Sequence, residues 1–259
     1  MTLVVVRALG LVTVQDLGRP GRMHEAIPPG GALVPELLVA ANRRARNPDG
    51  AAAIEVLGRL VVRAEAELAV ATAASAHVLA PGDELAIESE PRRVAYLAVR
   101  GGVDAPLVLG GHGALLAAGL GSPLRAGDRI TPARAPVADA IAESLVDADR
   151  IRVIAGPDHT AFAPDAIERL AAAPYRLLAA SDRVGTRLDG AVLPRVVGYR
   201  ETSRPMVRGA IEVPGDGLPI VLGPEHPTTG GYPIVAVIAA ADLGRFFAIR
   251  LGGSVHFER

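Results

Sequence analysis

The residues best suited to chemistry are two arginines and a serine in the short segment from Ser181 to Leu188. If this segment is extended, alternate side chains share one face, so Ser181, Arg183 and Arg187 project together. Two guanidiniums beside a hydroxyl suit the planar recognition of a carboxylate or phosphate. The same spacing fits a structural arginine pair bonded to nearby acids, and spacing alone leaves both interpretations open.

The loop from Pro227 to Pro233 is a second candidate. It combines two hydroxyls, an aromatic ring and two residues that are free to adopt positive φ. These residues are Thr228, Thr229, Gly230, Gly231 and Tyr232. A tight turn between two strands, capped by the hydroxyls, is the alternative interpretation. Because loops often carry function, we expect this loop to line one cleft with the Ser181–Arg183 segment.

A glycine-rich stretch from Leu109 to Ser122 offers backbone N–H groups that could surround an anion. Turns between strands need glycine for the same backbone geometry. That second interpretation is the favoured one.

The composition excludes several kinds of chemistry. The chain has no cysteine, and all 27 of its basic residues are arginines. Thiolate nucleophiles, disulfides, a P-loop lysine, a Schiff-base lysine and covalent biotin on this chain are therefore excluded. The six histidines are never two to four residues apart, so no metal site is expected.

Charge and hydropathy exclude other partners. The 27 basic and 28 acidic residues give a net charge of -1, without the basic run that nucleic acid requires. The longest uncharged apolar run, Ile234 to Ala241, is far shorter than the ~20 residues of a membrane helix. The first residues predict a strand rather than a secretory leader. We therefore expect a cytoplasmic protein that binds neither nucleic acid nor membranes.

The elements that position the candidate segments are mostly short strands. Apolar runs rich in Val, Ile and Leu alternate with Gly, Pro and Asp turn signals. A turn followed by a strand recurs at Pro81, Ala126 and Gly252, which favours barrels. Three short helices are expected: one opens at Pro35 and stops at Asn47, one opens at Pro164 and ends before Pro174, and one covers Ala240 to Ile249.

A domain boundary is expected between Thr131 and Asp149. Proline breaks there precede an Ala/Asp/Glu-rich stretch without periodicity. About 100 residues on either side suffice for a small β domain. The predicted fold is mainly β, with one barrel-like domain over residues 1–134 and a second over residues 150–259.

Five motifs occur in an order that resembles one family over residues 3–257. They are Thr13-Val14-Gln15-Asp16-Leu17-Gly18-Arg19, Asn47-Pro48-Asp49, Ser181-Asp182-Arg183-Val184-Gly185, Gly209-Ala210-Ile211-Glu212-Val213-Pro214 and Thr228-Thr229-Gly230-Gly231-Tyr232-Pro233. The chain resembles the biotin-dependent carboxyltransferase-like family. That family includes a subunit of bacterial 5-oxoprolinase, allophanate hydrolase subunit 2, an antagonist of a sporulation-kinase inhibitor and part of urea carboxylase.

The resemblance implies two cyclophilin-like β-barrel domains and a partner subunit that supplies the other half of the site. The partner would resemble the kinase inhibitor or allophanate hydrolase subunit 1. The complex would bind a small amide or carboxylate and use ATP to open 5-oxo-L-proline to L-glutamate, with an ATP site that the sequence does not locate.

Under this hypothesis the candidate residues take separate roles. Arg183 and Arg187 would hold negative charge beside Ser181, and Asp182 would orient the substrate or accept a proton. The oxyanion would be contacted by Thr228, Thr229 and the N–H groups of Gly230 and Gly231, with Tyr232 also binding substrate.

The chain departs from the family pattern in three places. Pro28–Val34 replaces the usual Pro-x-Ser-Gly-Ala-Met-Asp, Leu109–Ala114 replaces Leu-Gly-Ser-Arg-Ser-Thr, and Pro227 replaces a glutamine. These losses leave two alternatives open. One is a non-catalytic regulatory or scaffolding subunit that antagonises a kinase inhibitor. The other is a carboxyltransferase or allophanate hydrolase subunit 2 acting on urea-like amides, which would need a separate biotin carrier.

Overall fold

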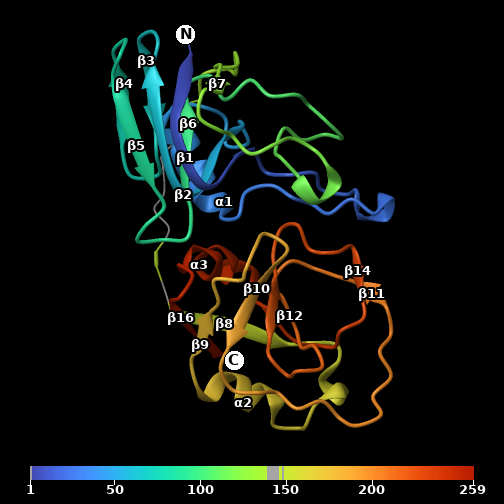
Figure 1. Ribbon diagram of the computed structural model, residues 1–259. Coiled ribbons are helices and arrows are strands. Elements are labelled where there is room, and N and C mark those ends of the chain that lie inside the picture. The colour runs from blue at the N-terminus through green and yellow to red at the C-terminus, as the bar shows by residue number, and fades with distance from the viewer. Residues whose placement is uncertain (1, 139–145, 148) are drawn as a thin grey trace. The chain divides into compact units, whose positions relative to one another are not determined.

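The computed structural model of the chain describes residues 2–138, 146, 147 and 149–259. The chain divides into two compact units, one of residues 1–20 and 30–145 and the other of residues 21–29 and 146–259. Both are built mainly from strands, as predicted (Figure 1). The sequence-based ranges, 1–134 and 150–259, stay predictions. The Ala/Asp/Glu-rich part of the expected boundary, residues 139–145, lies outside the described residues.

The first unit contains a seven-stranded sheet in the order β4-β3-β6-β2-β1-β7, with β5 also paired to β2. Its strands are β1 (Leu3–Gln15), β2 (Ala53–Ala64), β3 (Leu68–Ala71), β4 (Ala76–Leu79), β5 (Glu84–Glu88), β6 (Ala95–Val99) and β7 (Arg129–Ile130). The helix α1 (Pro35–Arg44) packs on β6, and a short 3-10 turn, η2 (Leu116–Ala118), lies within the glycine-rich stretch.

The alternation of apolar residues in β2 decides which face of this sheet is buried. Leu60 and Val62 are fully buried, whereas Arg59 and Arg63 point outward, because successive side chains on a strand face opposite ways. β1 and β2 pair along their whole length, from Leu3 opposite Ala64 to Gln15 opposite Ala53. This long ladder carries the Gln15-to-Arg19 segment to the end of the sheet.

The second unit is built around a closed barrel in the order β10-β13-β12-β15-β8-β16-β9. Its strands are β8 (Arg150–Ala155), β9 (Tyr175–Leu177), β10 (Gly185–Asp189), β12 (Ala210–Glu212), β13 (Ile220–Leu222), β15 (Ile234–Ile238) and β16 (Ser254–Glu258). A separate pair consists of β11 (Arg204–Pro205) and β14 (Thr229–Gly230). The barrel predicted for this region is confirmed.

The helices are short, as the sequence predicts. α1 begins at Pro35, as expected, and α2 (Ala166–Ala172) ends before Pro174. The third predicted helix consists of a 3-10 turn, η4 (Ala240–Asp242), followed by α3 (Leu243–Ala248); two further 3-10 turns are η1 (Met23–Glu25) and η3 (His159–Ala161). In the described part of the chain no helix has the length and apolar character needed to cross a membrane.

The few aromatic residues of the barrel core pack against one another. Phe246 lies 5.1 Å from Phe247 and 6.2 Å from Phe257, measured between ring centroids. Tyr175 packs beside Phe257 and donates its hydroxyl to the carbonyl of Ala191 at 2.8 Å. Burial raises the pKa of Tyr175 to about 12. The hydroxyl is therefore a neutral donor at ordinary pH, as a buried tyrosine requires.

Asp242 fastens the last helical segment to the barrel. Its buried carboxylate accepts hydrogen bonds from Nε of Arg152 at 2.8 Å, from the Arg152 backbone N–H at 3.0 Å and from Arg245 at 3.2 Å. The hydrogen bond from Arg152 holds the pKa of Asp242 at about 2, against the opposing effect of burial. A carboxyl group with a depressed pKa stabilises the fold only while it is ionised.

We predict that the second unit loses stability as the pH falls from about 4 to 2. Since the pKa of Asp242 is lower in the folded chain than the usual 3.8, its contribution is complete above that value and disappears as the carboxylate is protonated. Asp242→Asn should lower the free energy of unfolding by about 2 kcal/mol at pH 7 and by much less near pH 2. Urea unfolding at several pH values measures this difference, and an equal loss at every pH would contradict it.

Candidate functional site

The Ser181–Arg183 segment is a turn rather than a strand. The Ser181 hydroxyl donates to the carbonyl of Leu178 at 2.6 Å and accepts the N–H of Arg187 at 3.0 Å. The Asp182 carboxylate accepts the N–H groups of Val184 at 2.8 Å and Gly185 at 3.0 Å. Short polar side chains close turns in this way, and β10 begins only at Gly185.

This turn separates the two arginines. Arg183 is buried, whereas Arg187 points outward from β10. The prediction that Ser181, Arg183 and Arg187 share one face is therefore wrong, because it required an extended backbone from 181 onward. The two arginines therefore do not extend from one face of a single strand.

Arg183 forms a buried ion pair with Glu225. Its Nε lies 2.6 Å from Oε1 of Glu225, and both side chains are at most 5% exposed. The backbone N–H of Glu225 also donates to the carbonyl of Arg183 at 3.1 Å. The structural interpretation of the sequence expected partners among nearby acids, but Arg183 pairs with an acid 42 residues away.

Arg187 belongs to the outer surface of the barrel. It lies opposite Ile220 of β13, and Glu212 of β12 lies opposite Ile220 on the other side. Burial raises the pKa of Glu212, and the charge of Arg187 partly opposes this effect. The charge of Arg187 therefore acts on Glu212 at the barrel surface. Its contact with substrate stays a prediction.

The loop from Thr228 to Tyr232 is bound to the segment that precedes β12. Arg204 lies opposite Gly230 and Pro205 opposite Thr229 in the β11–β14 pair. A side chain on Gly230 would collide with Met206, since a Cβ there would lie 2.2 Å from the Met206 Cε. Gly230 is not among the glycines with positive φ, so glycine at this position makes room for the Met206 side chain rather than for a left-handed turn.

A buried carboxylate, Asp158, holds both sides of this loop. It contacts Arg204 Nη2 at 2.6 Å and accepts the N–H of Ile234 at 3.0 Å. The Tyr199 hydroxyl donates to it at 2.8 Å, and this hydrogen bond raises the pKa of Tyr199. Sequence reasoning missed Asp158 and Arg204, because their partners come from elements that are distant along the chain.

His226 lies between the Arg183–Glu225 pair and the loop, and it too was missed. It is buried, and its Nδ1 lies 2.7 Å from the carbonyl of Pro227. Burial lowers the pKa of His226, the hydrogen bond to Pro227 opposes this, and the charge of Arg208 adds to the lowering. The neutral ring that results donates from Nδ1, which leaves Nε2 as the acceptor nitrogen.

The two predicted segments are connected through residues 223–226. The N–H of Gly223 donates to the carbonyl of Val184 at 2.8 Å, and Glu225 completes the connection to Arg183. The loop with Thr228 and Thr229 follows directly. Thr229 and Tyr232 are exposed and Thr228 half-buried, so the loop presents hydroxyl groups to solvent. The shared cleft stays a prediction.

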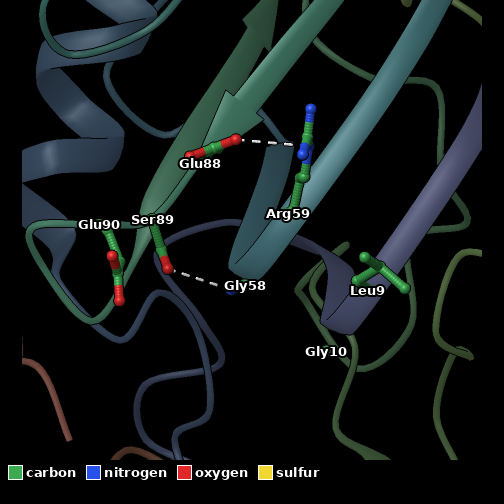
Figure 2. Close-up of a pocket in the computed structure, with 7 residues that line it drawn as sticks. All are labelled: Leu9, Gly10, Gly58, Arg59, Glu88, Ser89 and Glu90. Carbon is green, nitrogen blue, oxygen red and sulfur yellow. Dashed lines mark hydrogen bonds and ion pairs between the residues drawn. The ribbon is translucent and has the colours of Figure 1, made fainter.

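A hollow of about 440 Å³ lies in the first unit (Figure 2). It is lined by Leu9, Gly10, Gly58, Arg59, Glu88, Ser89 and Glu90. Arg59 and Glu88 form a cross-strand ion pair at 3.4 Å, and the Ser89 hydroxyl accepts the Gly58 N–H at 3.1 Å. None of the predicted site residues lines it. Within the described ranges no three His, Asp or Glu side chains gather to hold a metal ion.

These features define a mainly β protein whose candidate site consists of a hydroxyl-bearing glycine loop supported by buried ion pairs. The chain belongs to the carboxyltransferase domain family, subdomains A and B, whose model matches residues 25–259. The predicted family resemblance is confirmed.

Several relatives are similar over nearly the whole chain. It is 32% identical to a subunit of the 5-oxoprolinase of Escherichia coli, over 98% of this chain and 90% of that protein. It is 26% identical to urea amidolyase of Lachancea kluyveri, over 95% of this chain but only 16% of that protein. A crystal structure of TTHA0988 matches with a TM-score of 0.87 and 29% identity, covering all of this chain and 56% of that one.

We predict that the Arg183–Glu225 pair contributes mainly to stability. Glu225→Gln leaves a buried guanidinium without its counter-charge, so the free energy of unfolding should fall by about 3 kcal/mol. Arg187→Gln on the exposed barrel surface is the matched control and should change it by about 0.5 kcal/mol or less. Urea unfolding of both variants measures this, and similar losses would show that the pair has no special role.

Proposed function

We propose that the chain is a subunit of a 5-oxoprolinase-type amidohydrolase that acts together with a partner polypeptide. The observation that carries this proposal is the 32% identity to the Escherichia coli 5-oxoprolinase subunit, which extends over 98% of this chain and 90% of the relative. The proposed reaction adds water across the lactam amide of 5-oxo-L-proline and gives L-glutamate, while the complex hydrolyses ATP to ADP and phosphate.

The geometry favours a site that needs a second polypeptide. Since Arg183 pairs with Glu225 and Arg187 points outward from β10, these two arginines do not share the face that was predicted to hold the substrate's negative charge. The chain also spans only 56% of TTHA0988. A partner that supplies further groups, of the subunit 1 type expected above, therefore fits the proposal.

Within the site, the exposed loop is best placed to meet the developing oxyanion. The hydroxyls of Thr228 and Thr229 and the N–H group of Gly231 are donors of the kind that stabilise such charge, whereas the predicted donor Gly230 is paired with Arg204 in the β11–β14 pair. The neutral His226 ring is an acceptor on the neighbouring segment. Asp182, whose carboxylate closes the turn at Val184, is assigned an orienting role.

Carboxyl transfer to a urea-like amide is the second candidate, favoured by the family to which the chain belongs. Urea amidolyase relatives support it. The chain has no lysine, so this reaction would require biotin on a separate carrier.

We predict that neither this chain alone nor its partner alone releases glutamate from 5-oxo-L-proline, and that the mixture does so only with ATP. Coupled assays of glutamate and ADP on the purified components measure this. Turnover by the single chain would contradict the proposal. Carboxylation of urea by the mixture with a biotinylated carrier, without glutamate release, would favour the second candidate.

We further predict that Thr229→Val lowers the turnover of the complex by about 100-fold, because it removes an oxyanion donor while keeping the shape of the side chain. Thr131→Val, at an exposed threonine of the first unit, is the control and should leave turnover unchanged. An unaltered rate for the Thr229 variant would remove this loop from the mechanism.

A further inference from the structure

Arg19 is a buried arginine that organises the glycine-rich loop of the first unit. It is 2% exposed. Its Nε donates to the carbonyl of Val108 at 2.9 Å, and its Nη2 donates to the carbonyls of Gly111 at 3.0 Å and Gly113 at 2.7 Å. The carbonyls of this loop therefore face a cation, so the loop does not surround an anion with its N–H groups as an isolated glycine loop would.

The charge of Arg19 faces no acidic partner in the part of the chain that the structure describes. Among the described residues, Arg19 makes no ion pair, and its buried Nη1 has no hydrogen-bond partner. Arg183, which is equally buried, lies 2.6 Å from a carboxylate. A buried cation without an acid, and a buried donor without an acceptor, both cost free energy. Such a group is a candidate for binding an anion from outside the chain.

The neighbouring acid does not fill this role. Asp16 directs one carboxylate oxygen to the N–H of Gly18 at 2.8 Å and the other to the N–H of His112 at 2.6 Å. Both contacts tie backbone segments together. Asp16 thus fixes the shape of the loop while Nη1 of Arg19 keeps its hydrogen-bonding capacity.

Nη1 of Arg19 lies next to Gly30, a residue without a side chain. A Cβ placed on Gly30 would lie 3.9 Å from Nη1 and 3.7 Å from Cδ1 of Leu115, without a clash. Gly30 and Gly31 both have positive φ, a conformation that glycine adopts at no steric cost. Because Nη1 is enclosed, a ligand reaches it only after a local rearrangement of the residues around it.

A second buried atom without a partner lies in the same part of the unit. Oε1 of Gln15 accepts no hydrogen bond from the described residues, whereas its Nε2 donates to Thr13 and to the carbonyl of Ala114. Oε1 and Arg19 both adjoin Gly113: a Cβ there would lie 2.6 Å from Oε1, and Nη2 binds the Gly113 carbonyl. Nη1 of Arg19 is thus a buried donor, and Oε1 of Gln15 a buried acceptor, without a hydrogen-bond partner among the described residues.

We propose that Arg19 and Gln15 form a binding site for a small organic acid, with Nη1 of Arg19 holding the carboxylate and Oε1 of Gln15 accepting an adjacent N–H. A carboxylate provides the counter-charge that the guanidinium lacks. 5-Oxo-L-proline has this chemistry, since its lactam N–H adjoins the carbon that bears the carboxylate. The choice of this acid rests on the proposed function, whereas the site itself rests on the geometry of Arg19.

A substitution at Gly30 tests the site, because it adds atoms beside Nη1 and leaves the hydrogen bonds of Arg19 to the loop carbonyls in place. Gly30→Ala adds one methyl group beside Nη1, and Gly119→Ala is the matched control, because Gly119 has a φ of 69° against 62° for Gly30 and no atom within 4 Å of its Cβ position. Calorimetric titration of 5-oxo-L-proline onto the chain, alone and with its partner, should show binding at least about tenfold weaker for Gly30→Ala. Gly119→Ala should bind like the wild type.

Two further measurements make the result specific. 2-Pyrrolidinone, which is the same lactam without the carboxylate, should not bind. Gly30→Ser places a hydroxyl where Nη1 can donate to it, so this variant should melt at a higher temperature than Gly30→Ala and should also lose the acid.

The inference is overturned if the wild type binds no 5-oxo-L-proline with or without its partner, if Gly30→Ala binds as the wild type does, or if Gly119→Ala loses as much affinity. Binding of 2-pyrrolidinone with equal affinity would also overturn it. Turnover of 5-oxo-L-proline with an unchanged KM in Gly30→Ala would refute this site but leave the proposed function intact. If Gly30→Ala weakened the binding of 5-oxo-L-proline but the wild-type complex did not turn it over, the site would stand and the proposed function would be refuted.

Discussion

The ion pair between Arg183 and Glu225 joins the two segments of the second unit that carry most of the reactive side chains. Both members are buried, so neither can leave the other without exposing an unpaired charge to a medium that solvates it poorly. The turn at Asp182 and the segment up to His226 are thereby held together, and the threonine loop begins where this connection ends. The position of that loop therefore depends on the Arg183–Glu225 ion pair, to which we assign no catalytic role.

The same requirement recurs at other buried charges. Asp158 takes Arg204, Tyr199 and a backbone N–H, and Asp242 takes Arg152. Each of these carboxylates joins segments that are distant along the chain. Arg19 differs, since its guanidinium has only carbonyl partners. Arg183, which is buried to a similar extent, is paired with a carboxylate, and this difference between the two arginines supports the proposal that Arg19 is a binding group.

Local patterns in the sequence predicted the secondary structure well where proline and glycine mark its limits. α1 begins at Pro35, and the turns at Pro81, Ala126 and Gly252 each lead into a strand, β5, β7 and β16. The extended conformation expected from Ser181 onward was wrong because the side chains of Ser181 and Asp182 bond to the local backbone. The alternation rule holds only from Gly185, where the strand begins.

Partners that are distant in sequence could not be predicted from spacing. Glu225 lies 42 residues from Arg183 and Arg204 lies 46 residues from Asp158, and no periodicity connects such positions. The sequence motifs did indicate the right family, because motif order records a fold without describing its contacts. What the motifs did not contain was the assignment of each charged side chain to packing or to binding.

The way in which the barrel closes has a consequence for biosynthesis. β16 pairs with β8 in parallel, His256 opposite Arg150, and on its other side it pairs with β9. Until residues 254–258 have left the ribosome, β8 and β9 each present an unpaired edge. A nascent chain stalled before this point would expose two strands that can pair with other chains, so the barrel is protected from this kind of aggregation only once β16 has been synthesised.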